Sequence, residues 1–70
     1  MKNLKYTDYW GHHARVVLTN GEEVKCFIVS GTSTLDAEDG IPSIDVEKYG
    51  PQGPLWEYFE DEIDHIELLD

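Results

Sequence analysis

Three histidines and their acidic neighbours are the first residues in this sequence that could carry chemistry. His12 and His13 are adjacent, Asp8 lies a few residues earlier, and His65 stands far along the chain. Such a set could bind a metal ion, because imidazole and carboxylate groups are common metal ligands. Adjacent side chains of a strand point to opposite faces of a sheet, however, so His12 and His13 would not meet at one ion. We therefore expect surface imidazoles and no metal site.

A lone cysteine and an acidic loop are the other candidates for chemistry. Cys26 has only Lys25 beside it in the sequence to lower its pKa, so we expect a small core residue. The acidic stretch over residues 36–40 lacks the ligand spacing and the terminal glutamate of an EF-hand calcium loop, which favours a solvated turn. No Ser-His-Asp arrangement and no glycine-rich phosphate loop is recognisable. The sequence therefore predicts no catalytic residues, no cofactor and no enzymatic activity.

Size and charge narrow the remaining classes of function. The chain has 70 residues, with 15 Asp and Glu against 5 Lys and Arg, so its net charge is −10. This balance disfavours a basic nucleic-acid-binding surface. Hydrophobic residues make up 40% of the chain, too many for a fully disordered protein, and the single cysteine excludes an internal disulfide framework. With no long apolar run and no signal peptide, we expect a soluble cytoplasmic domain without membrane contact.

The pattern of apolar residues predicts a mainly β fold behind a short N-terminal helix. Asn3 is the expected N-cap of that helix, and Gly11 stands where it would end. Alternating apolar residues or a β-prone composition then mark five stretches, which we interpret as antiparallel strands over residues 14–19, 24–29, 43–47, 55–59 and 63–68. Asn20-Gly21 predicts a hairpin with a type I′ turn, in which both central residues have positive φ. Residues 30–42 are expected to form a loop.

The strand over residues 55–59 has large apolar side chains on both of its faces. Leu55 and Phe59 would point one way, and Trp56 and Tyr58 the other. Both pairs cannot be buried in one small core, so one face is exposed, covered by the N-terminal helix, or buried between subunits. Five short strands favour a small bent barrel, whose closure would remove exposed edges. Both the SH3-like type and the five-stranded oligonucleotide-binding type are possible, although the latter usually needs a longer chain.

Several motifs resemble the Sm-like (LSm) family, an SH3-like barrel entered by an N-terminal helix. The matching segments are residues 16–21 for its first strand and hairpin, 24–28 for its second strand, 35–36 within its first motif, and 58–66 for its second motif. The resemblance implies one Sm-like domain over residues 1–70, with a helix over 3–10 and a five-stranded barrel over 12–69. It also implies assembly, because neighbouring subunits of Sm-like rings pair the fourth strand of one with the fifth strand of the next.

The residues at the RNA-contacting positions of the family depart from its pattern. Asp36 stands where RNA-binding members generally have Asn, and Phe59-Glu60 stands where they have Arg-Gly. A carboxylate cannot donate the hydrogen bonds of an amide, and phenylalanine lacks the charge of arginine. The acidic residues 60–62 would also repel a phosphate backbone, and residues 36–40 form an insertion relative to the family's tighter geometry. The resemblance therefore implies the fold, while these positions disfavour RNA binding.

These observations favour a non-enzymatic Sm-like barrel that self-associates or docks a protein partner. The candidate interface residues are Leu55, Trp56, Tyr58, Phe59, His65 and Glu67. Two alternatives stay open. In the first, a divergent single-stranded RNA-binding protein would use Thr32, Asp36 and Tyr49. In the second, an acidic module would bind a basic protein, since residues 57–70 contain seven Asp and Glu and no Lys or Arg.

Overall fold

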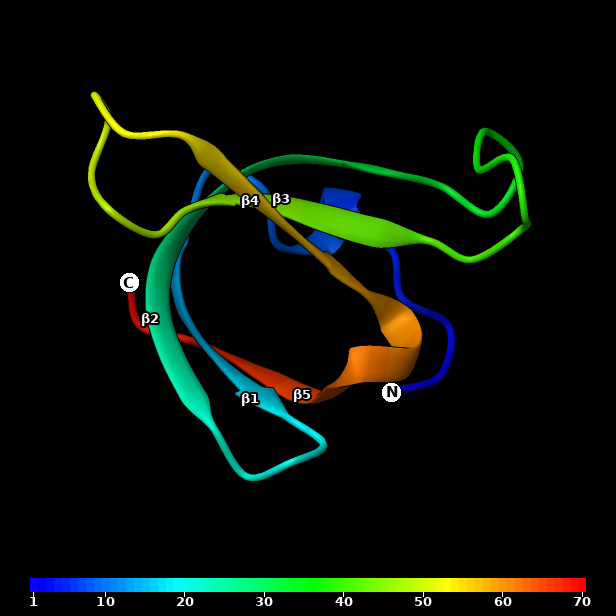
Figure 1. Ribbon diagram of the computed structural model, residues 1–70, viewed down its shortest axis with the longest axis horizontal. Helices are drawn as coiled ribbons and strands as arrows, with labels where there is room; N and C mark the ends of the chain where they lie inside the picture. The colour runs from blue at the N-terminus through cyan, green and yellow to red at the C-terminus, as the bar shows by residue number, and fades with distance from the viewer.

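The computed structural model describes residues 1–70 and contains one antiparallel sheet of five strands (Figure 1). Its order is β4-β3-β2-β1-β5. The strands are β1 (His13–Leu18), β2 (Glu23–Thr32), β3 (Ser43–Glu47), β4 (Leu55–Phe59) and β5 (Ile63–Leu68), and the 3-10 turns are η1 (Tyr6–Asp8) and η2 (Glu60–Glu62). The predicted mainly β fold of five antiparallel strands is confirmed. Neither 3-10 turn is long enough to cross a membrane.

The sheet is strongly bent, but its two edges are not joined. Figure 1 shows β2 curving between β1 on one side and β3 on the other. Two register shifts interrupt the ladders, one between Val17 and Leu18 and one between Ile28 and Ser30. Such irregularities increase the local bend and twist of a strand. No ladder connects β4 to β5, so the structure shows an open bent sheet with two edge strands, and not the closed barrel that we expected.

The hairpin between β1 and β2 has a different turn from the predicted one. The Gly21 N–H donates to the Leu18 carbonyl at 2.9 Å, and the Leu18 N–H donates to the Glu22 carbonyl at 2.8 Å. Only Gly21 has a positive φ, of +90°, whereas Asn20 does not. This is a three-residue loop ending in a left-handed glycine, so the type I′ assignment is wrong. The Asn20 side chain instead accepts the Glu22 N–H at 2.9 Å.

β2 is longer than its sequence pattern indicated. We expected a loop from Ser30, but the strand continues to Thr32. The register shift after Ile28 allows the segment Ser30–Thr32 to pair with the first residues of β3, down to Ser43. The pattern was misleading because Ser, Gly and Thr usually mark loops, while here the neighbouring strand supplies the hydrogen-bond partners.

The N-terminal segment forms less helix than predicted. Only Tyr6–Asp8 is helical, as a single 3-10 turn, and Lys5 occupies its N-cap position. Asn3 is therefore not the cap, and it adopts a left-handed conformation with a φ of 58°. Two turns of isolated helix are marginal in water, so packing decides how much of this segment is helical.

The core is a single cluster of alternating inward side chains. Its eleven buried members are Leu4, Ala14, Val16, Leu18, Val24, Cys26, Ile28, Ile44, Val46, Tyr58 and Ile63. The predicted inward faces of β2 and β3 are confirmed by this set. Burial also raises the pKa of the Cys26 thiol to about 11, because desolvation disfavours the thiolate. Cys26 is thus a core residue, as predicted, and it is protonated at neutral pH.

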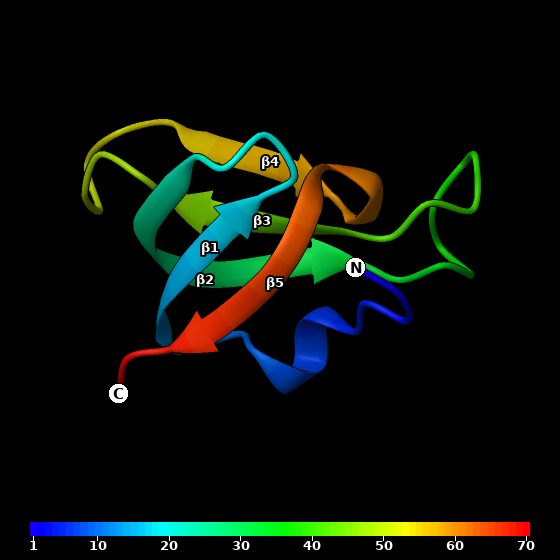
Figure 2. The ribbon, with the colours of Figure 1, turned by 90° about the horizontal axis from the view of Figure 1, so that it is seen from below.

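η1 covers β2 and leaves β4 uncovered. Figure 2 shows η1 beside β2, on the opposite side of the molecule from β4. The close approach is made possible by Gly31, where an added Cβ would lie 2.4 Å from the Tyr6 Cβ and 2.5 Å from the Ser43 carbonyl oxygen. The N-terminal segment therefore does not cover the aromatic strand, which removes one of the three possibilities raised by its sequence.

We expect Gly31→Ala to lower the free energy of unfolding by about 3 kcal/mol, at the upper end of the usual cost of overpacking, because backbone and Tyr6 must both move. Chemical denaturation would measure the loss. Gly40→Ala is the matched control: its φ of +78° is strained for alanine, but its Cβ would meet no atom within 4 Å, so we expect a cost of only about 1 kcal/mol. Equal destabilisation by the two substitutions would contradict the steric explanation.

Candidate functional site: the two edges of the sheet

The first candidate surface is the edge formed by β4. Leu55 is 55% exposed and Trp56 is 44% exposed, whereas Tyr58 is only 3% exposed. Trp56 pairs with Val46 of β3, and Tyr58 pairs with Ile44. Because Val46 and Ile44 belong to the core, both aromatic side chains lie on the core-facing side of the sheet. On this side of the sheet the Tyr58 side chain is covered by its neighbours, whereas the Trp56 side chain is partly exposed to solvent. A large apolar surface is therefore accessible along an unpaired edge strand, which is typical of interaction sites.

The second candidate surface is the edge formed by β5. This strand pairs only with β1, and Leu68 and the following Leu69 are 45% and 47% exposed. Two of the predicted interface residues, His65 and Glu67, are also exposed on it. β4 has five residues and β5 has six, so the two edges are of similar length. All six predicted interface residues lie on these edge strands, four on β4 and two on β5.

Charged side chains on β5 form a local network around His65. The two ring nitrogens of His65 lie 2.6 Å from an Asp64 carboxylate oxygen and 2.8 Å from a Glu67 carboxylate oxygen. Glu67 also accepts a hydrogen bond from Arg15 of β1 at 3.0 Å. The pKa of His65 is raised, first by its hydrogen bond to Asp64 and then by its hydrogen bond to Glu67, while the pKa of Glu67 is lowered, chiefly by His65. His65 therefore holds its proton to a higher pH than a free imidazole, between two carboxylates of the same strand.

His12 and His13 meet a single carboxylate, contrary to the expectation that they point apart. Their Nδ1 atoms lie 3.1 Å and 3.0 Å from the two carboxylate oxygens of Asp70, and the His13 N–H also donates to that group. The reason is that His12 precedes β1, so strand alternation does not apply to it. These hydrogen bonds, led by that of the His13 backbone, lower the pKa of Asp70 to about 2. No group of three or more His, Cys, Asp or Glu residues is arranged to hold a metal ion.

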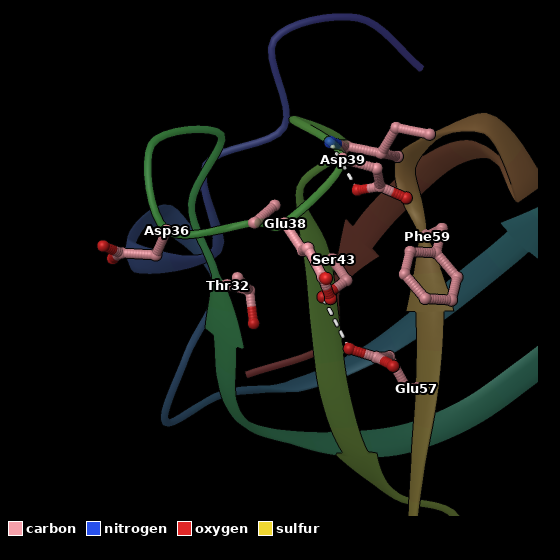
Figure 3. A pocket seen from close by; sticks show the side chains of 9 residues that line it. Thr32, Asp36, Glu38, Asp39, Ser43, Glu57 and Phe59 are labelled. Carbon is pink, nitrogen blue, oxygen red and sulfur yellow. Dashed lines mark hydrogen bonds between the residues drawn. The ribbon is translucent and has the colours of Figure 1, made fainter.

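A hollow of about 320 Å³ lies beside β3 and β4, under the loop that follows β2 (Figure 3). The residues lining it are Thr32, Asp36, Ala37, Glu38, Asp39, Ile41, Ser43, Glu57 and Phe59. Within it the Ser43 hydroxyl donates to Glu57 at 2.9 Å. The lining contains four carboxylates and no cation, and Figure 3 shows the Asp36 side chain turned away from Glu57 and Phe59. Such a lining repels phosphate groups.

The three candidate RNA-contacting residues are not brought together. Thr32 and Asp36 line the acidic hollow, but Tyr49 is not part of it. Tyr49 lies near the Lys48 ammonium group instead, at 5.6 Å from Nζ to the ring centroid. Glu60, at the second position of the family's Arg-Gly pair, accepts the Leu4 N–H at 2.8 Å and so holds the N-terminal segment. None of the side chains at these candidate RNA-contacting positions carries a positive charge that could contact a phosphate.

Sequence reasoning missed the cluster around Lys48. Its Nζ lies 4.7 Å from the Trp56 ring centroid and 5.9 Å from that of Tyr58. The contact between Lys48 and the aromatic rings follows from the register in which β3 pairs with β4. Glu47 pairs with Leu55, so Lys48 comes next on the side of the sheet that carries Trp56. Once the register is known, alternation alone brings a cation to the aromatic side chains.

No protein-family model, curated protein or solved structure matches this chain. The resemblance to the Sm-like family therefore stays a prediction that rests on the motifs quoted above. A small antiparallel sheet does not by itself identify a family, because similar sheets serve many unrelated functions. The features of this chain that bear on function are the two edges and the side chains that they expose.

We expect Asp64→Asn to lower the pKa of His65 toward its ordinary value of 6.5, because it removes the first cause of the upward shift. In the unmodified protein, the raised pKa means that the His65 interactions stabilise the fold fully below pH 6.5 and are lost as the pH rises through the folded-state pKa. An NMR titration of the imidazole signals measures both proteins. Asp61→Asn, an exposed acidic residue of η2, is the control and should leave the His65 titration unchanged; identical effects of the two variants would refute the assignment.

Proposed function

We propose that this protein is a non-enzymatic, Sm-like interaction module that assembles by placing β4 of one copy beside β5 of the next. One observation carries the proposal: the sheet has two unpaired edges of similar length, and each edge exposes large apolar side chains. Unpaired strands present N–H and C=O groups that another strand can satisfy. The resemblance to Sm-like rings supports the same pair of strands.

The small apolar area that one chain can bury supports a protein partner for these edges. The core has eleven members, and a chain of this size buries only about 60% of its unfolded surface. Self-association is one common way in which small folds bury more apolar surface. Leu55 on one edge, with Leu68 and Leu69 on the other, are the apolar side chains that would lose contact with water.

Geometry favours a ring or a filament over a dimer. β4 and β5 are different surfaces, so their contact would be heterologous and would leave one free edge of each kind on every pair. Further copies can therefore add until the ring closes. The net charge of −10 per chain opposes this assembly, and salt would screen the repulsion. We therefore propose that the assembled state becomes more populated as ionic strength rises.

The two alternatives differ in their support. The acidic lining of the hollow around Asp36 counts against a divergent RNA-binding protein, which would need a phosphate contact. A basic protein partner fits the net charge and is compatible with the edges. A cytoplasmic location remains part of the proposal, because the single cysteine is buried and unpaired and so requires no oxidising compartment.

We expect light scattering on a sizing column to give a mass several times the 8.0 kDa of one chain. Leu55→Glu and Leu68→Glu should each shift the protein to smaller species, because each places a charge on one edge. Leu35→Glu is the matched control: Leu35 is 96% exposed on the loop after β2 and belongs to neither edge strand, so the variant should keep the full mass.

Mixing the two edge variants tests the pairing itself. Leu55→Glu retains an intact β5 edge and Leu68→Glu retains an intact β4 edge, so an equimolar mixture should form a dimer of one copy of each. Pairing of like edges would instead give no new species on mixing. A monomer at every concentration and salt, for the unmodified protein, would overturn self-association and leave the edges to a different protein.

A further inference from the structure

The Lys48 ammonium group lies among three aromatic rings where β3 ends and β4 begins. Its Nζ is 4.7 Å from the ring centroid of Trp56, 5.6 Å from that of Tyr49 and 5.9 Å from that of Tyr58. All three distances lie within the range of cation–π attraction, in which the negative face of a ring stabilises a positive charge. We call Tyr49, Trp56 and Tyr58 the aromatic cage. The cage already holds one organic cation, supplied by the protein itself.

The cage combines a fixed floor with accessible walls. Tyr58 is 3% exposed and belongs to the core, so its position is set by packing. Trp56 and Tyr49 are 44% and 62% exposed, so their rings can be reached from solvent. Lys48 enters the cage on a flexible side chain with four methylene groups. If that side chain turns away, the ring faces become available to a cation from outside.

Electrostatics make this place favourable for positive charge. The pKa of Lys48 is raised, first by a hydrogen bond to the Tyr58 hydroxyl and also by the charge of Glu22. The whole chain has a net charge of −10, which attracts cationic partners from a distance. A second copy of the chain would bring the same negative charge, and a nucleic acid would bring more. A basic segment of another protein therefore matches the site best.

We propose that the aromatic cage binds the Lys or Arg side chain of a basic segment in a partner protein, and that Lys48 is its internal competitor. This site is distinct from the edge pairing proposed above. It uses the faces of aromatic rings and takes a cation, whereas edge pairing uses the backbone and apolar side chains. Lys48 would lower the affinity of the cage for every such side chain, and a segment that adds other contacts to the acidic surface would bind most tightly.

The test is an NMR titration of the protein with two short peptides of glycine and serine. One contains a single central lysine, and the other contains norleucine there, which keeps the aliphatic chain and lacks the charge. The lysine peptide should shift the indole signal of Trp56 and leave that of Trp10 unmoved, since Trp10 is 49% exposed but packs edge-on against Tyr6, outside the cage. Equal shifts with the norleucine peptide would overturn the proposal.

Variants separate the cage from the general negative charge. Trp56→Leu should weaken lysine-peptide binding about three- to thirtyfold, and Tyr49→Ala should weaken it in the same direction should Trp56→Leu fail to fold. Lys48→Met should bind the peptide about three- to tenfold more tightly, because the competitor is gone. Lys25→Met, on an exposed position of β2, removes the same charge elsewhere. Equal affinities of Lys48→Met and Lys25→Met would refute the role of Lys48.

The same samples distinguish this proposal from self-association. Leu55→Glu is designed to disrupt assembly and leaves the three rings in place, so it should still bind the lysine peptide. Light scattering on each sample reports the mass independently of the peptide. An unmodified protein that stays monomeric and binds the lysine peptide would refute edge pairing alone, and an assembled unmodified protein without any binding would refute the cage alone.

Discussion

The whole structure depends on how β2 pairs with two neighbours at once. This strand holds β1 on one side and β3 on the other, and it bends at the register shift after Ile28. The bend lets a chain of 70 residues enclose a core of eleven side chains. The pairing of β2 also determines which strands lie at the edges of the sheet. Because β2 is the middle strand, with β3 and β1 as its neighbours, β4 and β5 are the two edge strands. Gly31 then admits Tyr6 against the same strand, so the N-terminal segment is used on β2 and cannot cover β4.

The exposed surface combines two opposing tendencies. Leu55, Trp56, Leu68 and Leu69 favour contact with other protein surfaces, because burying them removes apolar area from water. The net charge of −10 opposes contact between identical copies and favours contact with basic proteins. Acidic side chains beside unpaired strands are a common protection against uncontrolled pairing. The balance between the two tendencies depends on ionic strength, which gives the edges a physical basis for selecting partners.

The sequence predicts most of the fold because alternation of apolar residues reports directly on the faces of strands. The five strands and the inward positions of Cys26 and Val46 follow from that pattern. The pattern does not predict three other features: the turn at Asn20-Gly21, the extension of β2 to Thr32 and the missing closure of the sheet. Each depends on backbone pairing between segments and not on the faces of single strands. The apolar residues of β4 marked one candidate edge, whereas the β5 edge was predicted only from the resemblance to Sm-like rings. The contact between Lys48 and Trp56 required the register of two strands, which no local pattern contains.

β4 can take part in two kinds of recognition because a strand has an edge as well as two faces. The edge offers backbone groups in the plane of the sheet, and the core-facing side offers the rings of Trp56 and Tyr58. A strand added at the edge would lie beside Trp56 without covering the ring from above. Assembly would therefore leave the aromatic cage open, and it would repeat the cage once per subunit. Repetition matters because a single cation–π contact is weak, whereas several cages held in one assembly can bind a segment with several basic residues far more tightly.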